Sequence, residues 1–302
     1  MLHWLVFGVF VLLIMALDLG VFNRKDKDET FRGAVIFSLF CVACALVFNA
    51  GIWFLKGSQP ALEFLTGYLV EEALSIDNIF IFLVIFSYFK VPKNLQRTVL
   101  FWGILGALLM RALFIMTGIS LLSHFHWIMY IFGGILVFTG IKMAFQGDEE
   151  INPEHNPVLR LMRKIVPISK NYAGRKFMVR QAGVLMATPL LMVLVVVETT
   201  DLIFAVDSIP AVLAITRDPF IVFTSNVFAI MGLRAMYFAL AGAMDKFHLL
   251  NYGLAVILCF VGAKMLLEPW LSIPILWTLG VIATALLLAG LASLSFPLKE
   301  KV

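Results

Sequence analysis

Charged side chains are scarce in this sequence of 302 residues: 14% are charged, whereas 62% are hydrophobic. Soluble globular domains contain roughly 25% charged and 45–50% apolar residues. The composition therefore excludes a water-soluble fold. Histidine and cysteine are also few, at five and three. Because the histidines map to the ends or loops of the apolar runs, the sequence disfavours a zinc or copper site.

The N-terminus lacks the basic residues that begin a secretory signal peptide. Met1 to Trp4 carry no positive charge, and the basic stretch Arg24 to Lys27 follows the first apolar run instead of preceding it. We therefore expect residues 2–22 to form a retained membrane helix whose N-terminus lies outside the cell.

Long apolar runs fill the rest of the chain. A helix of about 20 residues crosses the ~30 Å hydrocarbon core of a bilayer, and only helices or closed barrels can span it. The sequence predicts an all-α polytopic membrane protein, a single transmembrane domain of about nine helices. Their predicted ranges are 2–22, 32–54, 64–89, 97–121, 125–144, 180–208, 219–242, 247–267 and 274–295.

Lysine and arginine are concentrated on one side of this predicted topology. That side is predicted to be cytoplasmic by the positive-inside rule, and it includes the C-terminus. The opposite loops offer little beyond Lys56 and Arg217. The net charge of +4 thus reflects membrane topology, and it needs no nucleic-acid partner to explain it.

Two parts of the chain are similar to each other. Leu109 to Phe114 are echoed by Gly232 to Tyr237, and an acid–five residues–Asp pattern occurs as Glu71 to Asp77 and as Asp201 to Asp207. Each copy spans the membrane three times, so the second must enter from the opposite side, as in many secondary transporters. We predict inverted repeats at about 61–144 and 179–267, joined by a cytoplasmic loop at 145–178. Helices 2–22, 32–54 and 274–295 are then peripheral.

Carboxylates outnumber cations inside the predicted spans. Burying one charge at a helix centre costs about 2.5–3.5 kcal/mol on insertion scales, so an excess of acids indicates a function. With neighbouring amide and hydroxyl oxygens they form an oxygen-only set, which favours Mg²⁺, Ca²⁺ or Mn²⁺. The predicted ligands are Glu71, Asp77, Asn78, Glu198, Asp201, Asp207 and Ser208.

A structural explanation of these acids remains open. Arg111 and Arg234, the only definite cations inside the spans, can each neutralise one acid while the others stay protonated and bond between helices. We favour this explanation for Asp18. For the two repeated acidic segments we favour ion binding at the midplane, with both arginines as charge partners.

The acidic helices are expected to be broken. Residues six apart point about 120° away from one another on a regular helix, so Glu71 and Asp77 diverge unless the helix unwinds. The apolar stretch from Ala182 to Ile215 is also long for one span, and Pro189 and Pro210 offer break points. Simple tilting of an unbroken helix is the alternative.

The acidic segments and several further stretches resemble the TerC family over nearly the whole chain. The matching segments are Glu71 to Asn78, Glu198 to Asp201, Phe204 to Ala211, Phe64 to Leu69, Phe86 to Phe89, Tyr130 to Gly133 and Leu233 to Phe238. The resemblance implies a bacterial inner-membrane protein linked to manganese export, with older labels of tellurium resistance and membrane-bound redox modulation. Relatives can carry a basic residue at the position of Glu72, which we therefore leave out of the ligand set.

The combined prediction is a secondary transporter, not an enzyme, that exports divalent metal cations, above all Mn²⁺, by proton-coupled alternating access through a midplane carboxylate site. It holds no permanently bound cofactor, and its partners are the metal ion, protons and the bilayer. One alternative is redox modulation through Cys41 and Cys44, which we disfavour because both lie in a predicted membrane helix. The other is a scaffold whose 145–178 loop recruits proteins for metal loading of secreted enzymes.

Overall fold

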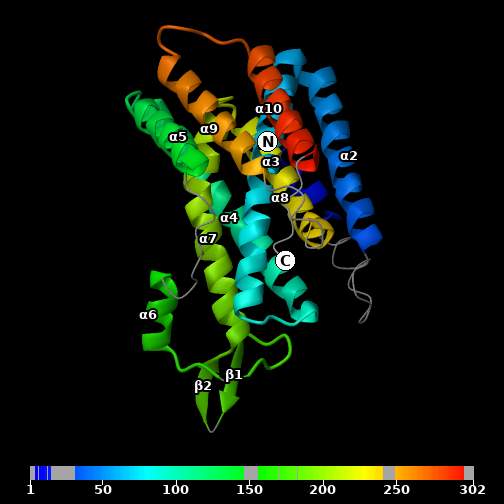
Figure 1. Ribbon diagram of the computed structural model, residues 1–302, viewed down its shortest axis with the longest axis vertical. Coiled ribbons are helices and arrows are strands. Elements are labelled where there is room, and N and C mark those ends of the chain that lie inside the picture. The colour runs from blue at the N-terminus through cyan, green and yellow to red at the C-terminus, as the bar shows by residue number, and fades with distance from the viewer. Residues whose placement is uncertain are drawn as a thin grey trace.

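The computed structural model describes residues 4–5, 7–11, 13–14, 31–145, 156–169, 171–181, 183–240 and 249–295. Long helices make up most of this part of the chain (Figure 1). They are α2 (Phe31–Lys56), α3 (Ser58–Tyr88), α4 (Lys93–His124), α5 (Ile128–Phe145), α7 (Pro189–Leu213), α8 (Pro219–Leu240), α9 (Leu250–Leu267) and α10 (Ile275–Ser295). The short helix α6 (Pro157–Ile165) and a two-stranded hairpin, β1 (Met178–Gln181) and β2 (Val184–Ala187), lie at one end of the bundle.

The predicted polytopic helical fold is confirmed. Seven described helices are long and apolar enough to cross a membrane, and α3 is longer than most of them but carries four carboxylates. Large apolar side chains on the outer helices are exposed, including Val47 and Phe54 on α2 and Leu287 on α10. Such a surface is suited to lipid. The first predicted span, 2–22, lies mostly outside the described residues.

The predicted breaks in the two acidic helices are wrong. Both α3 and α7 are continuous helices. Pro189 begins α7, where a missing N–H costs nothing, and Pro210 lies one turn before its end. The apolar stretch from 182 to 215 is too long for one span, but its first residues are not helical. Residues 184–187 form β2, and the helix begins only at Pro189.

The hairpin and α6 cover the end of the bundle where α3 ends and α7 begins. The side chain of Asn156 caps α6 by accepting hydrogen bonds from the amides of Val158 and Leu159. The Tyr172 hydroxyl donates to the Phe89 carbonyl at 2.8 Å. Burial raises the pKa of Tyr172, which keeps this phenol protonated as a donor. The contact ties the loop to the α3–α4 turn.

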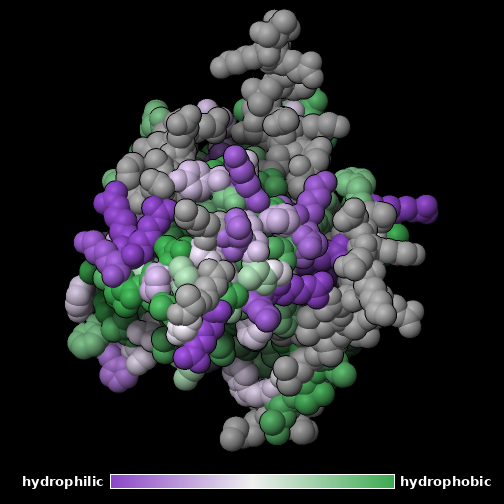
Figure 2. All heavy atoms as spheres, turned by 90° about the horizontal axis from the view of Figure 1, so that it is seen from below, coloured by the Kyte–Doolittle hydropathy of each residue, from purple (hydrophilic) through white to green (hydrophobic). Residues whose placement is uncertain are grey.

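Hydrophilic side chains gather over this hairpin end (Figure 2). Its exposed basic residues are Lys90, Lys93, Arg160, Arg163, Lys164, Arg175, Lys176 and Arg180. At the opposite end Lys56 pairs with Asp218 and Arg217 pairs with Glu268. Among the described residues, basic charge in excess of acid is thus gathered at the hairpin end.

The six central helices pack in a reciprocal pattern. Helix α3 packs on α8, α4 packs on α7, α5 packs on α9, and α3 and α7 touch each other. Since α3 ends and α7 begins at the hairpin end, these two helices run in opposite directions. Each first helix of a predicted repeat therefore contacts the second helix of the other. Whether the units are inverted repeats remains a prediction.

Glycines allow close approach of α5 and α9. A Cβ atom built on Gly140 would lie 2.8 Å from the Ala255 carbonyl and 2.9 Å from the Cys259 amide nitrogen, whereas one on Gly134 would meet nothing within 4 Å. Backbone atoms cannot yield as a flexible side chain can. This interface therefore requires glycine at position 140.

Replacing Gly140 by Ala is expected to lower the free energy of unfolding by about 1–3 kcal/mol, as overpacking does elsewhere. Alanine favours a helix over glycine by up to about 1 kcal/mol, so Gly134→Ala should be neutral or stabilising. Unfolding of both variants in detergent micelles provides the comparison. Equal stability of the two would contradict the tight α5–α9 interface.

Candidate functional site

Four buried polar side chains meet in the middle of the bundle. The Arg111 guanidinium on α4 pairs closely with Glu71 on α3, donates to the Asn226 side-chain oxygen on α8 at 2.9 Å, and lies 3.5 Å from an Asp201 oxygen on α7. All four residues are at most 4% exposed. We call them the central cluster. Side chains from three helices therefore converge on a guanidinium that a fourth helix supplies.

Regular helix geometry places two further predicted ligands on the same helix faces as the acids of the central cluster. Residues seven apart on a helix differ by only about 20° in direction, so Asn78 follows Glu71 on one face and Ser208 follows Asp201 on another. Asn78 and Ser208 are both buried. Because Glu71 and Asp201 lie near the centres of their helices, the central cluster is at mid-depth in the bundle.

The two carboxylates of the central cluster are only partly satisfied. Within the described part of the chain, Oε2 of Glu71, Oδ2 of Asp201 and the Ser208 hydroxyl have no hydrogen-bond partner. The Ser208 hydroxyl approaches Glu71, but without the geometry of a hydrogen bond. Buried polar atoms are normally paired, and exceptions are concentrated at functional sites. Each acid thus keeps one buried oxygen available for another ligand.

The other predicted acids lie at different depths. Asp77 is about 9 Å along α3 from Glu71 toward the hairpin end, and Asp207 is about 9 Å along α7 from Asp201 toward the opposite end. Glu198 lies one turn from Asp201 on the hairpin side. All three are half-buried. The carboxylates therefore form a series across the bundle.

Neighbouring helices position two of these outlying acids. Asp207 accepts a hydrogen bond from the Thr139 hydroxyl on α5 at 2.8 Å. Glu198 lies against Gly106 on α4, where an added Cβ would collide with its carboxyl group. Over the described residues no three acidic, histidine or cysteine side chains are grouped closely enough to hold a metal ion. Binding of one ion by the full predicted ligand set stays a prediction.

The remaining residues singled out in the sequence lie elsewhere. Arg234 is buried on α8, but it is Arg111 that contacts both central carboxylates. Glu72 faces Gly232 on α8. Asp18 lies outside the described residues. Asn226 was missed by the sequence analysis, although an amide in the apolar run of α8 was a signal that could have identified it.

A small pocket adjoins Asp201. Its lining is otherwise apolar and consists of Phe82, Leu100, Gly103, Ile104, Ala107, Val197, Ile230 and Leu233. Phe82 lies beyond Glu71 toward the hairpin end, and Leu100 lies on the same side of Arg111. The pocket therefore approaches the central cluster from the hairpin end.

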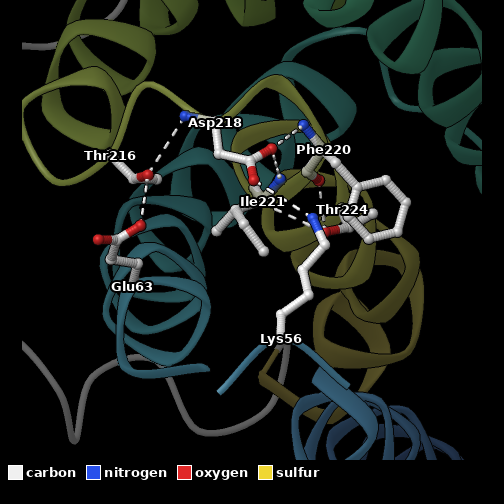
Figure 3. A network of polar contacts seen from close by, with 7 residues as sticks. All are labelled: Lys56, Glu63, Thr216, Asp218, Phe220, Ile221 and Thr224. Carbon is white, nitrogen blue, oxygen red and sulfur yellow. Dashed lines mark hydrogen bonds and ion pairs between the residues drawn. The ribbon is translucent and has the colours of Figure 1, made fainter. Parts of the chain in front are cut away.

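A polar network links α2, α3 and the α7–α8 loop at the opposite end (Figure 3). The Thr216 hydroxyl donates to Glu63 on α3 at 2.6 Å, and Lys56 at the end of α2 pairs with Asp218 at 3.3 Å. Asp218 also accepts the Phe220 amide at 2.8 Å and so caps α8. The loop between α7 and α8 is thereby held against α2 and α3.

Comparison with known proteins decides the family. The model of the integral membrane protein TerC family matches residues 56–301, a range that contains every residue of the central cluster. The chain belongs to the TerC family. No solved structure matches the chain, so the TerC assignment stands on sequence.

Relatives match this TerC chain along almost all of its length. "Uncharacterized membrane protein STKORF319" of Myxococcus xanthus is 50% identical over 291 residues, which cover 96% of this chain and 91% of that protein. "Putative membrane-bound redox modulator Alx" of Escherichia coli K12 is 48% identical over 288 residues, 92% of this chain and 90% of that protein. "Uncharacterized membrane protein" of Rickettsia bellii is 39% identical, with 96% of both chains covered.

Proposed function

We propose that this TerC protein is a secondary transporter that exports divalent metal cations, with Mn²⁺ as its main substrate. The observation that carries the proposal is the convergence of Glu71 and Asp201, buried in the middle of two antiparallel helices, on one cationic group. Each acid keeps a buried oxygen without a partner among the described residues. Oxygen ligands suit Mn²⁺, Ca²⁺ and Mg²⁺.

The depths of the carboxylates supply a route for the ion. Asp77 and Glu198 receive it on the hairpin side, Glu71 and Asp201 hold it at the centre, and Asp207 passes it on. The reciprocal packing of the central helices supports alternating access, in which two three-helix units rock about a central site. The ion-binding residues are then exposed to one side at a time.

The conformation fits an ion entering from the hairpin side. The small pocket beside Asp201 lies on the hairpin side of the central cluster, and the network of Glu63, Lys56 and Asp218 links the helices at the other end. The Lys56–Asp218 pair is more than one-third exposed, and exposed pairs are worth about 0–1 kcal/mol. Its rupture during opening costs little.

The basic hairpin end is assigned to the cytoplasm. With this orientation the N-terminus lies outside, the C-terminus is cytoplasmic, and the membrane is the bacterial inner membrane. Export then moves two positive charges against an inside-negative potential, at about 4.6 kcal/mol per 100 mV. Such work requires coupling, and we propose that protons return through the same carboxylates.

Proteoliposomes loaded with Mn²⁺ test this coupling. The initial rate of Mn²⁺ efflux is expected to rise when the outside is made acidic and to fall when the gradient is reversed. Collapse of the gradient with a proton ionophore serves as the control. Efflux that is indifferent to the pH gradient would remove the antiport mechanism while leaving transport itself in place.

Redox modulation, the role in the printed name of the Escherichia coli relative, is the second candidate. Cys41, Cys44 and Cys259 form no disulfide bond, and the first two lie one turn apart on α2. If transport is the function, the variant with Cys41→Ala and Cys44→Ala should retain the wild-type rate of Mn²⁺ efflux. A loss of efflux in the folded variant would favour the redox role.

A further inference from the structure

Arg111 occupies the position where a transported cation would be neutralised. Its guanidinium lies between the carboxylates of Glu71 and Asp201, and the side chain is fully enclosed by the bundle. A guanidinium offers a fixed fork of N–H donors to carboxylate oxygens, which are the same atoms that coordinate a hard divalent cation. The arginine and the cation therefore require the same partners.

The guanidinium lies closer to the Glu71 carboxylate than to the Asp201 carboxylate. Its contact with Glu71 is close, whereas the Asp201 oxygen is 3.5 Å away. Asn226 fixes it from a third side through a neutral amide oxygen at 2.9 Å. Asp201 also lines the pocket on the hairpin side and has an oxygen, Oδ2, without a partner among the described residues. Asp201 is therefore the more weakly held of the two acids, and it is the one that lies beside the pocket on the hairpin side.

The geometry points to Arg111 as a built-in counter-ion that competes with the transported divalent cation for Glu71 and Asp201. This inference rests on the proposed function. The incoming ion displaces the guanidinium from Asp201, because a dication and an arginine repel strongly at such short range in a low-dielectric interior. Return of the guanidinium then expels the ion and keeps the empty carboxylates neutralised. Arg111 thereby weakens binding and speeds release.

Mn²⁺ binding to the purified full-length protein, followed by calorimetry, tests this competition. Removing the competitor in Arg111→Gln should lower the apparent Kd at least about tenfold, which corresponds to 1.4 kcal/mol. Efflux from proteoliposomes should slow in the same variant, because the bound ion is no longer expelled. Arg217→Gln removes an equal charge at the opposite end and should leave the Kd unchanged.

Two milder variants keep the test valid if Arg111→Gln does not fold. Arg111→Lys retains the charge but loses the fork, and Asn226→Ala removes an anchor of the guanidinium without changing any charge. Each should tighten Mn²⁺ binding by about threefold, less than full removal of the cation, which corresponds to about 0.65 kcal/mol. An unchanged or raised Kd in the folded variants would overturn the proposal, since a merely structural Arg111 would behave in that way.

The outcomes separate this inference from the proposed function. A wild-type protein that binds and moves Mn²⁺, together with Arg111 variants that bind no more tightly, overturns the competition alone. A wild-type protein that neither binds nor moves Mn²⁺ overturns both. Tighter binding and slower efflux in Arg111→Gln support both.

Discussion

Replacing Asp201 by Asn, or Glu71 by Gln, is expected to reduce the initial rate of Mn²⁺ efflux from proteoliposomes by about 100-fold. The change removes a charged ligand without altering its size. Loss of one charged contact of about 2–3 kcal/mol corresponds to that factor in rate. Protein density in the liposomes must be matched, because rates are compared per molecule.

Glu268→Gln provides the matched control. Glu268 forms an exposed ion pair with Arg217 at the end opposite the hairpin, so its replacement removes the same charge far from the central cluster. We expect its efflux rate to stay within about twofold of the wild type, since an exposed pair is worth about 0–1 kcal/mol. Wild-type rates in the Asp201 and Glu71 variants would exclude the central cluster as the site.

Replacing Arg111 by Met is expected to lower the free energy of unfolding by about 3–5 kcal/mol, because it leaves two buried carboxylates without their common cation. Removing a carboxylate as well, in the double variant Arg111→Met with Glu71→Gln, should recover part of this loss, because Asp201 alone is then left without its cation. The coupling between the two positions can be measured by a double-mutant cycle in detergent micelles without added metal.

The exposed Arg217–Glu268 pair gives the comparison for this cycle. The side chains of this pair are 45% and 48% exposed, and Arg217→Met should cost about 1 kcal/mol or less. If the cycle at Arg111 and Glu71 yields a coupling as small as that of the exposed pair, the buried contact does not hold the four helices together.

Much of the fold follows from the sequence because membrane spans are encoded in long apolar runs. The predicted range 219–242 corresponds to α8 at Pro219–Leu240, and 274–295 corresponds to α10 at Ile275–Ser295. Glu71 and Asp201 were also identifiable, since the same spacing of acids occurs twice. The structure places these two acids around a single arginine.

The helix breaks could not be predicted correctly from proline alone. Pro189 begins α7, where a missing N–H is tolerated, and Pro210 lies in its last turn, so the loss of one hydrogen bond there does not divide the helix. The position of each proline within the helix depends on where the span begins. The hairpin was missed because Val184 to Ala187 are as apolar as the helix that follows. Gly183, with a φ of 84°, is the turn residue that could have indicated it.

The sequence pattern also could not predict which side chains on different helices contact each other. Asp207 points to Thr139 on α5, and Asn226 reaches Arg111 from α8. Such pairs depend on how helices pack against each other. With no break in α3, Glu71 and Asp77 lie about 9 Å apart along its axis and point in different directions, so these acids are at different depths.

Everything proposed for the central cluster requires that this TerC protein moves divalent cations. The most direct measurement compares initial fluxes of Mn²⁺, Ca²⁺ and Mg²⁺ in proteoliposomes that hold the purified wild-type protein with those in protein-free liposomes. We predict a Mn²⁺ flux well above the protein-free background and above the fluxes of Ca²⁺ and Mg²⁺. Fluxes of all three ions that equal the background, under either direction of the pH gradient, would exclude transport of divalent cations by this protein.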